Sequence, residues 1–504
     1  MTIKYFFTLI LISGAIASAS AQSAGTLIPG FGNDGKVITA IGNYLCAQRT
    51  VIDNNGKILV LARINLNPSN LALSRYLPNG DLDPTFGSNG TVVTPVKSGL
   101  LVDLALQPDG KILVNGEETT FPSGLLVARY LTNGTLDPAF GNQGIFKSAV
   151  SPSRGYAVAL TTDEKIVSAG NAFNSATQNQ DIFLTRILPN GTVDASFGNN
   201  GTITHNFGSS EFVFEMAIQP DGKIVVFGKS NILPTYAVFR FLSNGMADIN
   251  FGTNGRVVLS QIAPVTWGDM RLQNDGKIVL GGTADDGSGE YQFWAARLLA
   301  NGSPDPTFGQ NGTVKTNFDG NLKGEALMID LQGRYIVGGE LQLPGQLTQM
   351  ALTRFTAQGT VDSGFGTNGL ARIEFGTGLN ESCTDMAQLG NGNIIALGCA
   401  LSFPQAKTII AGLSPGSTTD VNQPEADAAP LLEYFPNPAG EWLYFRGHLD
   451  ANTRITLTDS RGKLLQQPEA GDGKISVAGL PAGLYYLVID TRKARYAYPV
   501  SVQR

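Results

Sequence analysis

The sequence predicts an all-β protein: a seven-bladed β-propeller followed by a small immunoglobulin-like β-sandwich. Short runs rich in Val, Ile and Leu alternate with Gly, Asn, Asp and Pro, as in strands joined by tight turns. No stretch has a sustained apolar period of about 3.6 residues, so helices should be scarce. The string Phe-Gly-x-x-Gly recurs seven times at intervals of 54 to 57 residues, starting at Phe31, Phe86, Phe140, Phe197, Phe251, Phe308 and Phe365.

Each repeat is long enough for four short strands. In the second repeat we expect strands at residues 91–96, 101–107, 111–116 and 125–131. Asp-Gly and Asn-Gly pairs between such strands suit hairpins because they accept the positive φ angles that these turns require. Four strands repeated seven times are typical of a propeller, with an open solenoid as the alternative.

The two ends of the array favour a closed ring. After residues 408–412 no further Phe-Gly-x-x-Gly strand follows, so the seventh blade lacks an outer strand. The first copy, residues 31–41, has no repeat of its own before it and is free to complete that blade. Closure also removes the sheet edges that an open array has to cap.

Composition argues against several classes of function. The chain of 504 residues has a formal charge of −6 and no run of Lys or Arg, which disfavours binding to nucleic acid or anionic lipid. Its two histidines, His205 and His448, fall in different predicted domains, so a histidine-based metal site is not expected. No Walker-type phosphate loop and no convincing dinucleotide fingerprint occur. We therefore expect no cofactor.

The first 21 residues fit a signal peptide. Lys4 supplies the positive charge, residues 5–16 the apolar stretch, and cleavage is expected between Ala21 and Gln22. The apolar stretch is shorter than a membrane-spanning helix and no later segment is long enough, so we expect no transmembrane span; an uncleaved anchor is the alternative. The predicted divisions are the signal peptide at 1–21, the propeller at 22–416, a polar linker at 417–430 and a C-terminal domain at 431–504.

Four carboxylates are candidate ligand-binding residues. They lie seven residues before the glycine of the first hairpin turn in their repeats, on the strand expected to line the channel: Asp103, Glu215, Asp269 and Asp385. Arg49 and Ala157 occupy the equivalent places in two other repeats. If all point inward, the carboxylates form an acidic mouth for a cation or a polar ligand. The alternative is that they are solvated channel walls.

A second set of residues recurs at a constant interval of eight. The pairs are Arg75 with Asp83, Arg129 with Asp137, Arg186 with Asp194, Arg240 with Asp248, Arg297 with Asp305, and Arg354 with Asp362. In the seventh repeat Ala411 is assigned to the arginine position and no Leu-Asp segment follows. Because a guanidinium matches a carboxylate geometrically, we interpret the pairs as structural, bracing the corner between blades.

The cysteines allow one disulfide. Cys383 and Cys399 lie symmetrically about Asn391, the centre of a predicted hairpin, so a regular register would place them opposite each other. Export permits oxidation. The prediction is a Cys383–Cys399 disulfide with Cys46 unpaired; two buried free thiols are the alternative.

The propeller motifs resemble a known repeat family. Leu-Asp-Pro-x-Phe-Gly-x-x-Gly, Gln-Pro-Asp-Gly-Lys-Ile and Ala-Arg-Tyr-Leu-x-Asn-Gly recur between residues 30 and 416, and resemble the delta-60 repeats of bacterial exported β-propellers. The resemblance is specific for fold and implies little about activity.

The C-terminal region resembles the sorting domain of the type IX secretion system. Strand-like stretches appear at 442–446, 454–459, 474–477, 484–490 and 496–502. The residues that carry the resemblance are Pro436, Asn437, Pro438, Gly462, Gly483, Tyr485 and the basic end at Arg504. It implies a Bacteroidetes-type bacterium, export across the outer membrane and the type IX machinery as a partner. An ordinary accessory sandwich is the alternative.

These observations favour a secreted or cell-surface propeller that acts as a non-catalytic binding or structural module, with an extracellular glycan or protein as ligand. The competing class is an extracellular carbohydrate-active hydrolase or lyase that uses carboxylates on one propeller face. A cofactor-dependent oxidoreductase is a third possibility, disfavoured because no ligand set for a cofactor is evident.

Overall fold

The computed structural model consists of two compact units, within residues 1–417 and 418–504. In the first unit it describes residues 22–40, 45–64, 70–97, 102–117, 123–230, 235–259, 268–285 and 289–416. In the second it describes 433–435, 442–446, 454–459, 464–466, 474–480, 483–490 and 495–502. Among these residues there is no helix of the length and apolarity that crossing a membrane requires.

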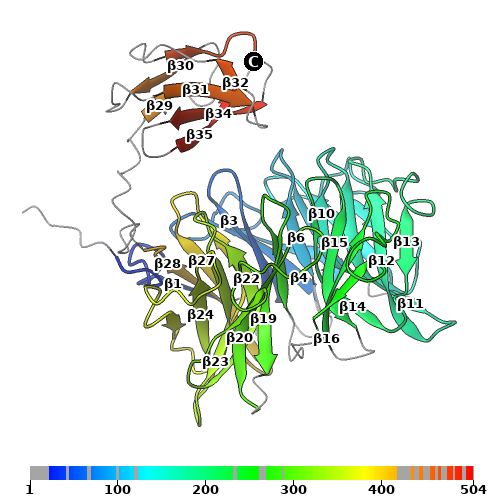
Figure 1. Ribbon diagram of the computed structural model, residues 1–504, viewed down its shortest axis with the longest axis horizontal. Coiled ribbons are helices and arrows are strands. Elements are labelled where there is room, and N and C mark those ends of the chain that lie inside the picture. Colours follow the sequence, from blue (N-terminus) through cyan, green and yellow to red (C-terminus); the bar gives the residue numbers. More distant parts are fainter. Residues whose placement is uncertain are drawn as a thin grey trace, which may run out of the picture. The chain divides into compact units, whose positions relative to one another are not determined.

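The first unit is a seven-bladed β-propeller of four-stranded antiparallel blades (Figure 1). Blade one comprises β2 (Leu45–Ile52), β3 (Ile58–Ile64), β4 (Asn70–Tyr76) and β5 (Thr91–Lys97). Blade two comprises β6 (Asp103–Leu106), β7 (Ile112–Glu117), β8 (Leu125–Tyr130) and β9 (Ile145–Lys147). Blade three comprises β10 (Ser153–Leu160), β11 (Ile166–Asn174), β12 (Asn179–Ile187) and β13 (Thr202–His205). Blades four and five comprise β14 (Glu211–Ile218), β15 (Ile224–Ser230), β16 (Thr235–Phe241) and β17 (Arg256–Val258); and β18 (Asp269–Leu272), β19 (Ile278–Asp285), β20 (Tyr291–Leu298) and β21 (Thr313–Lys315). Blades six and seven comprise β22 (Asn321–Ile329), β23 (Tyr335–Gln342), β24 (Gln349–Phe355) and β25 (Leu370–Ile373); and β26 (Asn380–Gln388), β27 (Ile394–Ser402), β28 (Gln405–Leu413) and β1 (Lys36–Thr39).

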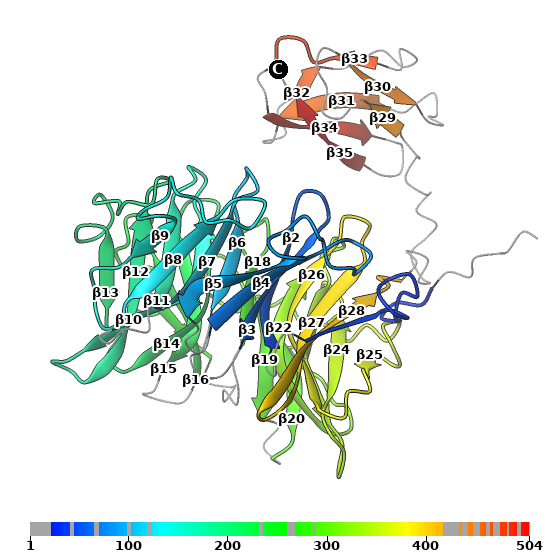
Figure 2. The ribbon, with the colours of Figure 1, turned by 180° about the vertical axis from the view of Figure 1, so that it is seen from behind.

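The predicted closure of the ring is confirmed. Strand β1, from the N-terminal part of the chain, pairs antiparallel with β28, and Lys36 lies opposite Ala411 (Figure 1). The innermost strands of the blades contact one another in the order β2, β6, β10, β14, β18, β22, β26 and back to β2. Figure 2 shows β2 beside β26, where the ring closes. Blade seven is therefore built from both ends of the propeller sequence.

The repeated turn positions a buried phenylalanine at each blade junction. In the second copy the Gly90 amide donates to the Phe86 carbonyl at 2.8 Å, and Gly90 has a φ of +90°, which favours glycine. Phe86 is fully buried, in a cluster with Leu73 of blade one and Val114 of blade two. The hydrophobic cores of the propeller thus lie between the faces of neighbouring blades.

The disulfide differs from the predicted one. Cys46 of β2 is bonded to Cys399 of β27, with their Cα atoms 5.0 Å apart, and Cys383 is a buried free thiol. The prediction assumed a regular hairpin. A bulge in β26 shifts the register by one residue, so that Cys383 lies opposite Gly398 and Cys399 lies opposite Ser382. Since successive side chains point to opposite faces of a strand, Cys383 and Cys399 lie on opposite faces, and Cys399 meets blade one instead.

The assignment of Ala411 to the arginine position is also wrong. Gly412 lies opposite Ile395 in blade seven, as Arg129 lies opposite Leu113 in blade two. Gly412 is therefore the structural equivalent of the arginine. The error is one residue, because β28 lacks the motif that aligns the other repeats.

The aspartate position of blade seven is filled from the N-terminal segment. The Ile28 amide donates to the Gly412 carbonyl at 2.9 Å, as the Asp137 amide donates to the Arg129 carbonyl at 2.9 Å. Residues 27–32 thus take the place of a Leu-Asp-Pro-x-Phe-Gly segment at the end of blade seven. Both members of the ion pair are replaced there, by Ile28 and Gly412.

The second unit contains two antiparallel sheets. One has the order β29 (Glu433–Phe435), β30 (Trp442–Arg446), β33 (Lys474–Ser476), and the other the order β32 (Leu464–Gln466), β31 (Arg454–Asp459), β34 (Gly483–Asp490), β35 (Arg495–Val502). Leu443 and Ile475 of the first sheet share a buried cluster with Leu457, Leu487 and Val500 of the second. Sequence reasoning missed the two short strands β29 and β32.

Two of the predicted sorting-domain residues are described. Gly483 begins β34, and Tyr485 is buried in the core of the second unit. Pro436, Asn437, Pro438, Gly462 and Arg504 lie outside the described residues, as does Ala21 at the predicted cleavage site.

Candidate functional site

Bulges in five of the inner strands each remove one residue from the regular alternation of side chains along the strand. In β2, β10, β14, β22 and β26 the register slips by one residue, at Gln48, Tyr156, Phe214, Glu325 and Thr384 respectively. Each lies eight residues before the equivalent hairpin-turn position, and Gly268 occupies that place in blade five. A bulge re-aims the side chain that it carries, so the bulged residue departs from the plain alternation of the strand.

A cavity of about 290 Å³ lies where the inner strands begin. Its lining residues are Cys46, Gln48, Arg49, Phe214, Gly268, Glu325, Glu340, Ser382, Thr384, Cys399 and Leu401. They come from blades one, four, five, six and seven, so the cavity lies at the mouth of the channel that the inner strands surround. We call it the channel-mouth cavity.

The four predicted carboxylates meet inside the channel with two arginines. Arg49 lies 3.6 Å from Asp103 and 3.7 Å from Glu215, measured between its guanidinium nitrogens and their carboxylate oxygens. Arg271 lies 2.5 Å from Asp269 and 3.3 Å from Asp385. We call these six residues the channel charge cluster.

Three of these aspartates also tie blades together through backbone amides. Asp103 accepts from the Val158 amide, Asp269 from the Leu327 amide and Asp385 from the Thr50 amide, each at 2.8 Å. In every case the donor belongs to the next blade. All four carboxylates are at most 8% exposed. They are therefore neither solvated walls nor an open acidic mouth, because their oxygens already have partners within the protein.

Burial shifts the ionisation of the cluster. Desolvation raises the pKa of Glu215 to about 8; Asp103 and Asp269 raise it as well, and the two arginines lower it. Desolvation also raises the pKa of Asp385 to about 6, against the opposing effect of Arg271 and Arg49. Burial thus favours the neutral acid form of Glu215, while the neighbouring arginines favour its ionised form.

Glu325 differs from the carboxylates of the cluster. It is a partly buried bulge residue that lines the channel-mouth cavity and has no hydrogen-bond or ion-pair partner among the described residues. Burial, together with the nearby Glu340 carboxylate, raises the pKa of Glu325 to about 7, while Lys323 and Arg49 lower it. Glu340 itself is paired with Lys323 at 3.0 Å.

Sequence reasoning found the charge cluster only in part and missed the cavity. Arg271 stands alone as a charged residue five positions before the turn glycine, where the other repeats have Val, Ala or Met. Glu325 lies one position before Ala326, the residue that matches the predicted carboxylate register. The available signal for Arg271 was that a charged residue interrupts an otherwise apolar position of the repeat, whereas the position of Glu325 varies between repeats and gave no such signal.

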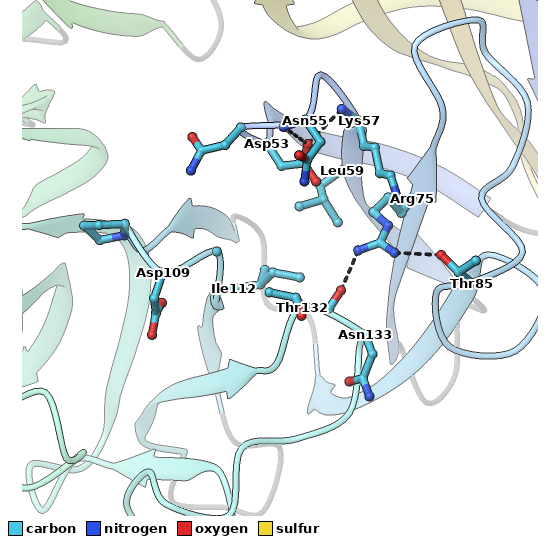
Figure 3. A pocket seen from close by; sticks show the side chains of 13 residues that line it. Asp53, Asn55, Lys57, Leu59, Arg75, Thr85, Asp109, Ile112, Thr132 and Asn133 are labelled. Carbon is cyan, nitrogen blue, oxygen red and sulfur yellow. Dashed lines mark hydrogen bonds between the residues drawn. The ribbon is translucent and has the colours of Figure 1, made fainter. Parts of the chain in front are cut away.

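The six Arg–Asp pairs lie at the blade junctions, away from the cavity. Their guanidinium-to-carboxylate distances are 2.7 to 2.9 Å, for Arg75–Asp83, Arg129–Asp137, Arg186–Asp194, Arg240–Asp248, Arg297–Asp305 and Arg354–Asp362. Each arginine also donates to a carbonyl of the next blade, at Thr132, Pro189, Ser243, Ala300, Ala357 or Pro415. Figure 3 shows Arg75 reaching from blade one to Thr132 of blade two.

Each of these arginines also covers the phenylalanine of the repeated turn. The guanidinium carbon lies 4.3 to 4.9 Å from the ring centre of Phe86, Phe140, Phe197, Phe251, Phe308 or Phe365. This distance is within the range of cation–π attraction. The pairs thus combine an ion pair, a ring contact and a bond to the next blade.

Within the described part of the chain, no group of three or more His, Cys, Asp or Glu side chains is arranged to hold a metal ion. The carboxylates of the charge cluster are interleaved with Arg49 and Arg271.

Comparison with protein families identifies both units. Residues 54–86, 107–140, 161–197, 219–251 and 273–308 match the family described as a domain of unknown function (DUF5122) beta-propeller. Residues 433–502 match the secretion system C-terminal sorting domain. The protein is thus a secreted or cell-surface β-propeller linked to type IX secretion. More specifically, it carries DUF5122 β-propeller repeats and a C-terminal sorting domain.

Three solved structures match the chain at low identity and low TM-score. PorZ, an essential bacterial surface component of the type IX secretion system of Porphyromonas gingivalis, is 12% identical with a TM-score of 0.31, and the match covers 90% of this chain and 65% of PorZ. The polysaccharide lyase Uly1 is 11% identical with a TM-score of 0.41, covering 80% and 94% of the two chains. The α-L-arabinofuranosidase Arb93A of Fusarium graminearum is 9% identical with a TM-score of 0.38, covering 78% and 98%. No curated protein matches the sequence.

Proposed function

We propose that this protein is a non-catalytic binding module whose ligand occupies the channel-mouth cavity. The supporting observation is that the repeats differ from one another at the residues that line the cavity. The junction residues recur from blade to blade, whereas the cavity is lined by Gln48, Phe214, Gly268, Glu325 and Thr384 at one equivalent position. A single ligand needs different side chains from different blades, and a purely structural position has no such need.

The chemistry of the charge cluster supports binding rather than catalysis. Asp103, Asp269 and Asp385 accept backbone hydrogen bonds and neighbour arginines, so their oxygens hold the ring together. A general acid or base has to reach the substrate within hydrogen-bond distance. None of these three aspartates lines the cavity.

Blocking the cavity tests this function. The full chain is screened against arrays of extracellular glycans and proteins, alongside a Thr384→Trp variant that fills the cavity without changing charge. We expect a ligand that binds the wild type and is lost in the variant, at an unchanged melting temperature. A ligand bound equally well by both would place the binding surface elsewhere and contradict the proposal.

A carbohydrate-active hydrolase or lyase is the second candidate. The observation that favours it is Glu325, a carboxyl with a pKa of about 7 beside Glu340 in a cavity. A group with that pKa is suited to proton transfer at neutral pH. Release of reducing ends or unsaturated sugars from a polysaccharide panel, abolished by Glu325→Gln, would establish this function in place of simple binding.

We further propose that the chain is exported in two stages. Residues 1–21 act as a signal peptide cleaved before Gln22, and the C-terminal domain at 431–504, joined by the linker at 417–430, directs passage through the type IX machinery. Mass spectrometry of secreted and surface fractions should find Gln22 as the first residue and a chain that ends before or within the linker. A mature protein that retains the intact C-terminal domain would contradict its removal.

A further inference from the structure

We infer that the channel-mouth cavity takes a small hydroxylated molecule bearing a primary ammonium group, with Glu325 as the acceptor. This inference rests on the proposed binding function and names the chemical class of its ligand. It depends on the charge balance of the channel, on two cavity side chains that lack hydrogen-bond partners among the described residues, and on the volume of the cavity.

The charge balance leaves an acidic excess at the cavity. The channel charge cluster and the lining of the cavity carry six carboxyl groups, on Asp103, Glu215, Asp269, Asp385, Glu325 and Glu340. The cations that pair with them are Arg49, Arg271 and Lys323. Glu325 takes part in none of these ion pairs, so an arriving cation would meet a carboxyl group without a counterion.

Glu325 is that carboxyl group. It carries no hydrogen bond and no ion pair within the described residues, although it is partly buried and faces the cavity. Removing a charged carboxylate from water without a partner is costly. An ammonium group in the cavity would supply three N–H donors and a compensating charge, and charge-assisted hydrogen bonds of this kind are the strong ones.

The second side chain available for hydrogen bonding to a ligand is a hydroxyl group. Ser382 lines the same cavity, and its side chain has no hydrogen-bond partner among the described residues. Thr384 donates only a long hydrogen bond, 3.5 Å, to the Leu397 carbonyl. These hydroxyls can bond to hydroxyl groups of a ligand, so the site suits an amine on a hydroxylated body better than an apolar amine.

The volume limits the size of the ligand. A cavity of about 290 Å³ lies at the lower end of the range for small-molecule sites, roughly 300 to 1,000 Å³. One sugar ring or one short amino alcohol fits such a space. A longer chain would have to extend out of the channel mouth.

Binding should be linked to ionisation of Glu325. With a pKa near 7 this group is partly protonated at neutral pH, and an ammonium ligand favours the ionised form, so the proton passes to the solvent on binding. The groups that face Glu325 are Glu340 of β23, Lys323 of its own strand, Arg49 of β2 and the Cys383 thiol of β26. Glu340 is held in its pair with Lys323, which leaves Glu325 as the group expected to titrate with the ligand.

Calorimetry on the full chain tests the inference with four probes: D-glucosamine, N-acetyl-D-glucosamine, D-glucose and ethanolamine. We expect the two amines to bind, with D-glucosamine tighter because it also presents hydroxyls, and the two neutral sugars to bind about ten- to a hundredfold more weakly than D-glucosamine. Ethanolamine affinity should rise from about pH 6 to about pH 8 as Glu325 ionises.

Two variants and one control complete the design. Glu325→Gln should abolish the preference for amines and flatten the pH dependence, and Thr384→Trp should remove binding by filling the cavity. The control, Glu374→Gln, removes an exposed carboxylate outside the cavity and should bind as the wild type does. Equal binding of amines and neutral sugars, full binding by Glu325→Gln, or no binding of either amine would overturn the inference. If another ligand is still lost in Thr384→Trp, the binding function stands and only the ammonium class fails.

Discussion

Two kinds of junction hold the propeller ring together. Six junctions, from blade one–two to blade six–seven, repeat an arginine that pairs with an aspartate, covers a phenylalanine and bonds to the next blade. The seventh junction, between blade seven and blade one, has Gly412 and Ile28 at the places of the arginine and aspartate. There the ring is closed by strand β1 and by the Cys46–Cys399 disulfide.

The difference follows from where the chain begins. The outer strand and the turn of blade seven come from residues 27–39, far in sequence from β28, so their association has to overcome the entropy of closing nearly the whole propeller as one loop. At Gly412 the Phe31 ring lies so close that an added Cβ would be 2.6 Å from it. The seventh junction therefore packs the phenylalanine directly against the backbone and uses a covalent bond across the same pair of blades.

The largest expected effect comes from removing the disulfide. It joins residues 353 apart in sequence, and a crosslink that closes so long a loop is expected to stabilise the fold by about 4 to 5 kcal/mol. Cys399→Ser should therefore lower the free energy of unfolding by an amount of that order, measured by denaturant titration. Cys383→Ser serves as the matched control.

The pairing itself can be checked chemically. Alkylation of the denatured, unreduced protein should label Cys383 and leave Cys46 and Cys399 unmodified. Labelling of Cys46 would restore the pairing that the sequence suggested and would remove the covalent closure of the seventh junction.

A repeated junction should depend on its arginine. Arg240→Ala leaves the buried Asp248 carboxylate without its ion pair and removes the bond to blade five, with an expected loss of about 3 kcal/mol in unfolding free energy. Arg372→Ala, at an exposed position, is the control and should change stability little. An unchanged melting temperature in Arg240→Ala would contradict the bracing role of the pairs.

Introducing an Arg–Asp pair into the seventh junction would test the difference between the two kinds of junction directly. Gly412→Arg alone introduces a buried cation beside Ile28, and Ile28→Asp alone introduces a carboxylate without its arginine, so both should destabilise the ring. The double variant should recover part of the loss, with a coupling of about 2 kcal/mol in a double-mutant cycle. Strict additivity would show that the seventh junction cannot accommodate the pair.

The smallest expected effect is an opposite response to pH of a channel carboxylate, Asp385, and a repeated junction aspartate, Asp83. Burial raises the pKa of Asp385, which bonds to blade one, to about 6. Between its ordinary value near 3.8 and about 6 the folded protein binds more protons there than the unfolded chain, so its contribution to stability falls as pH rises. Asp385→Asn should therefore flatten the fall of the melting temperature over that pH range.

The repeated junctions should respond to acid instead. Burial raises the pKa of Asp83, but hydrogen bonds from Lys57, Thr85 and Arg75 outweigh it and hold the pKa well below its usual range. The stability that Asp83 contributes is present above the usual pKa of an aspartate and is lost as pH falls through the lowered value. Asp83→Asn should therefore remove part of the acid sensitivity below about pH 4 and leave the slope between pH 4 and 6 unchanged.

Sequence reasoning predicted the shared position of the channel carboxylates but not their surroundings or the cavity. The constant distance to the hairpin glycine predicted correctly that Asp103, Glu215, Asp269 and Asp385 share one position on the inner strands. It did not reveal that they are buried among two arginines and backbone amides from the next blade. Glu325, one residue out of that register, escaped notice because only the bulge in β22 turns it into the cavity.

By itself the sequence determined the number of blades, the four strands in each, the strand exchange that closes the ring and the identity of the C-terminal unit. These features follow from local chemistry: turn residues at fixed offsets, β-branched runs, and a repeated motif whose number of copies gives the number of blades. Only the tertiary structure decided the Cys46–Cys399 bond, the Gly412 and Ile28 substitution and the channel-mouth cavity. They depend on bulges that shift register by one residue and on contacts between blades hundreds of residues apart, and neither leaves a periodic trace in the sequence.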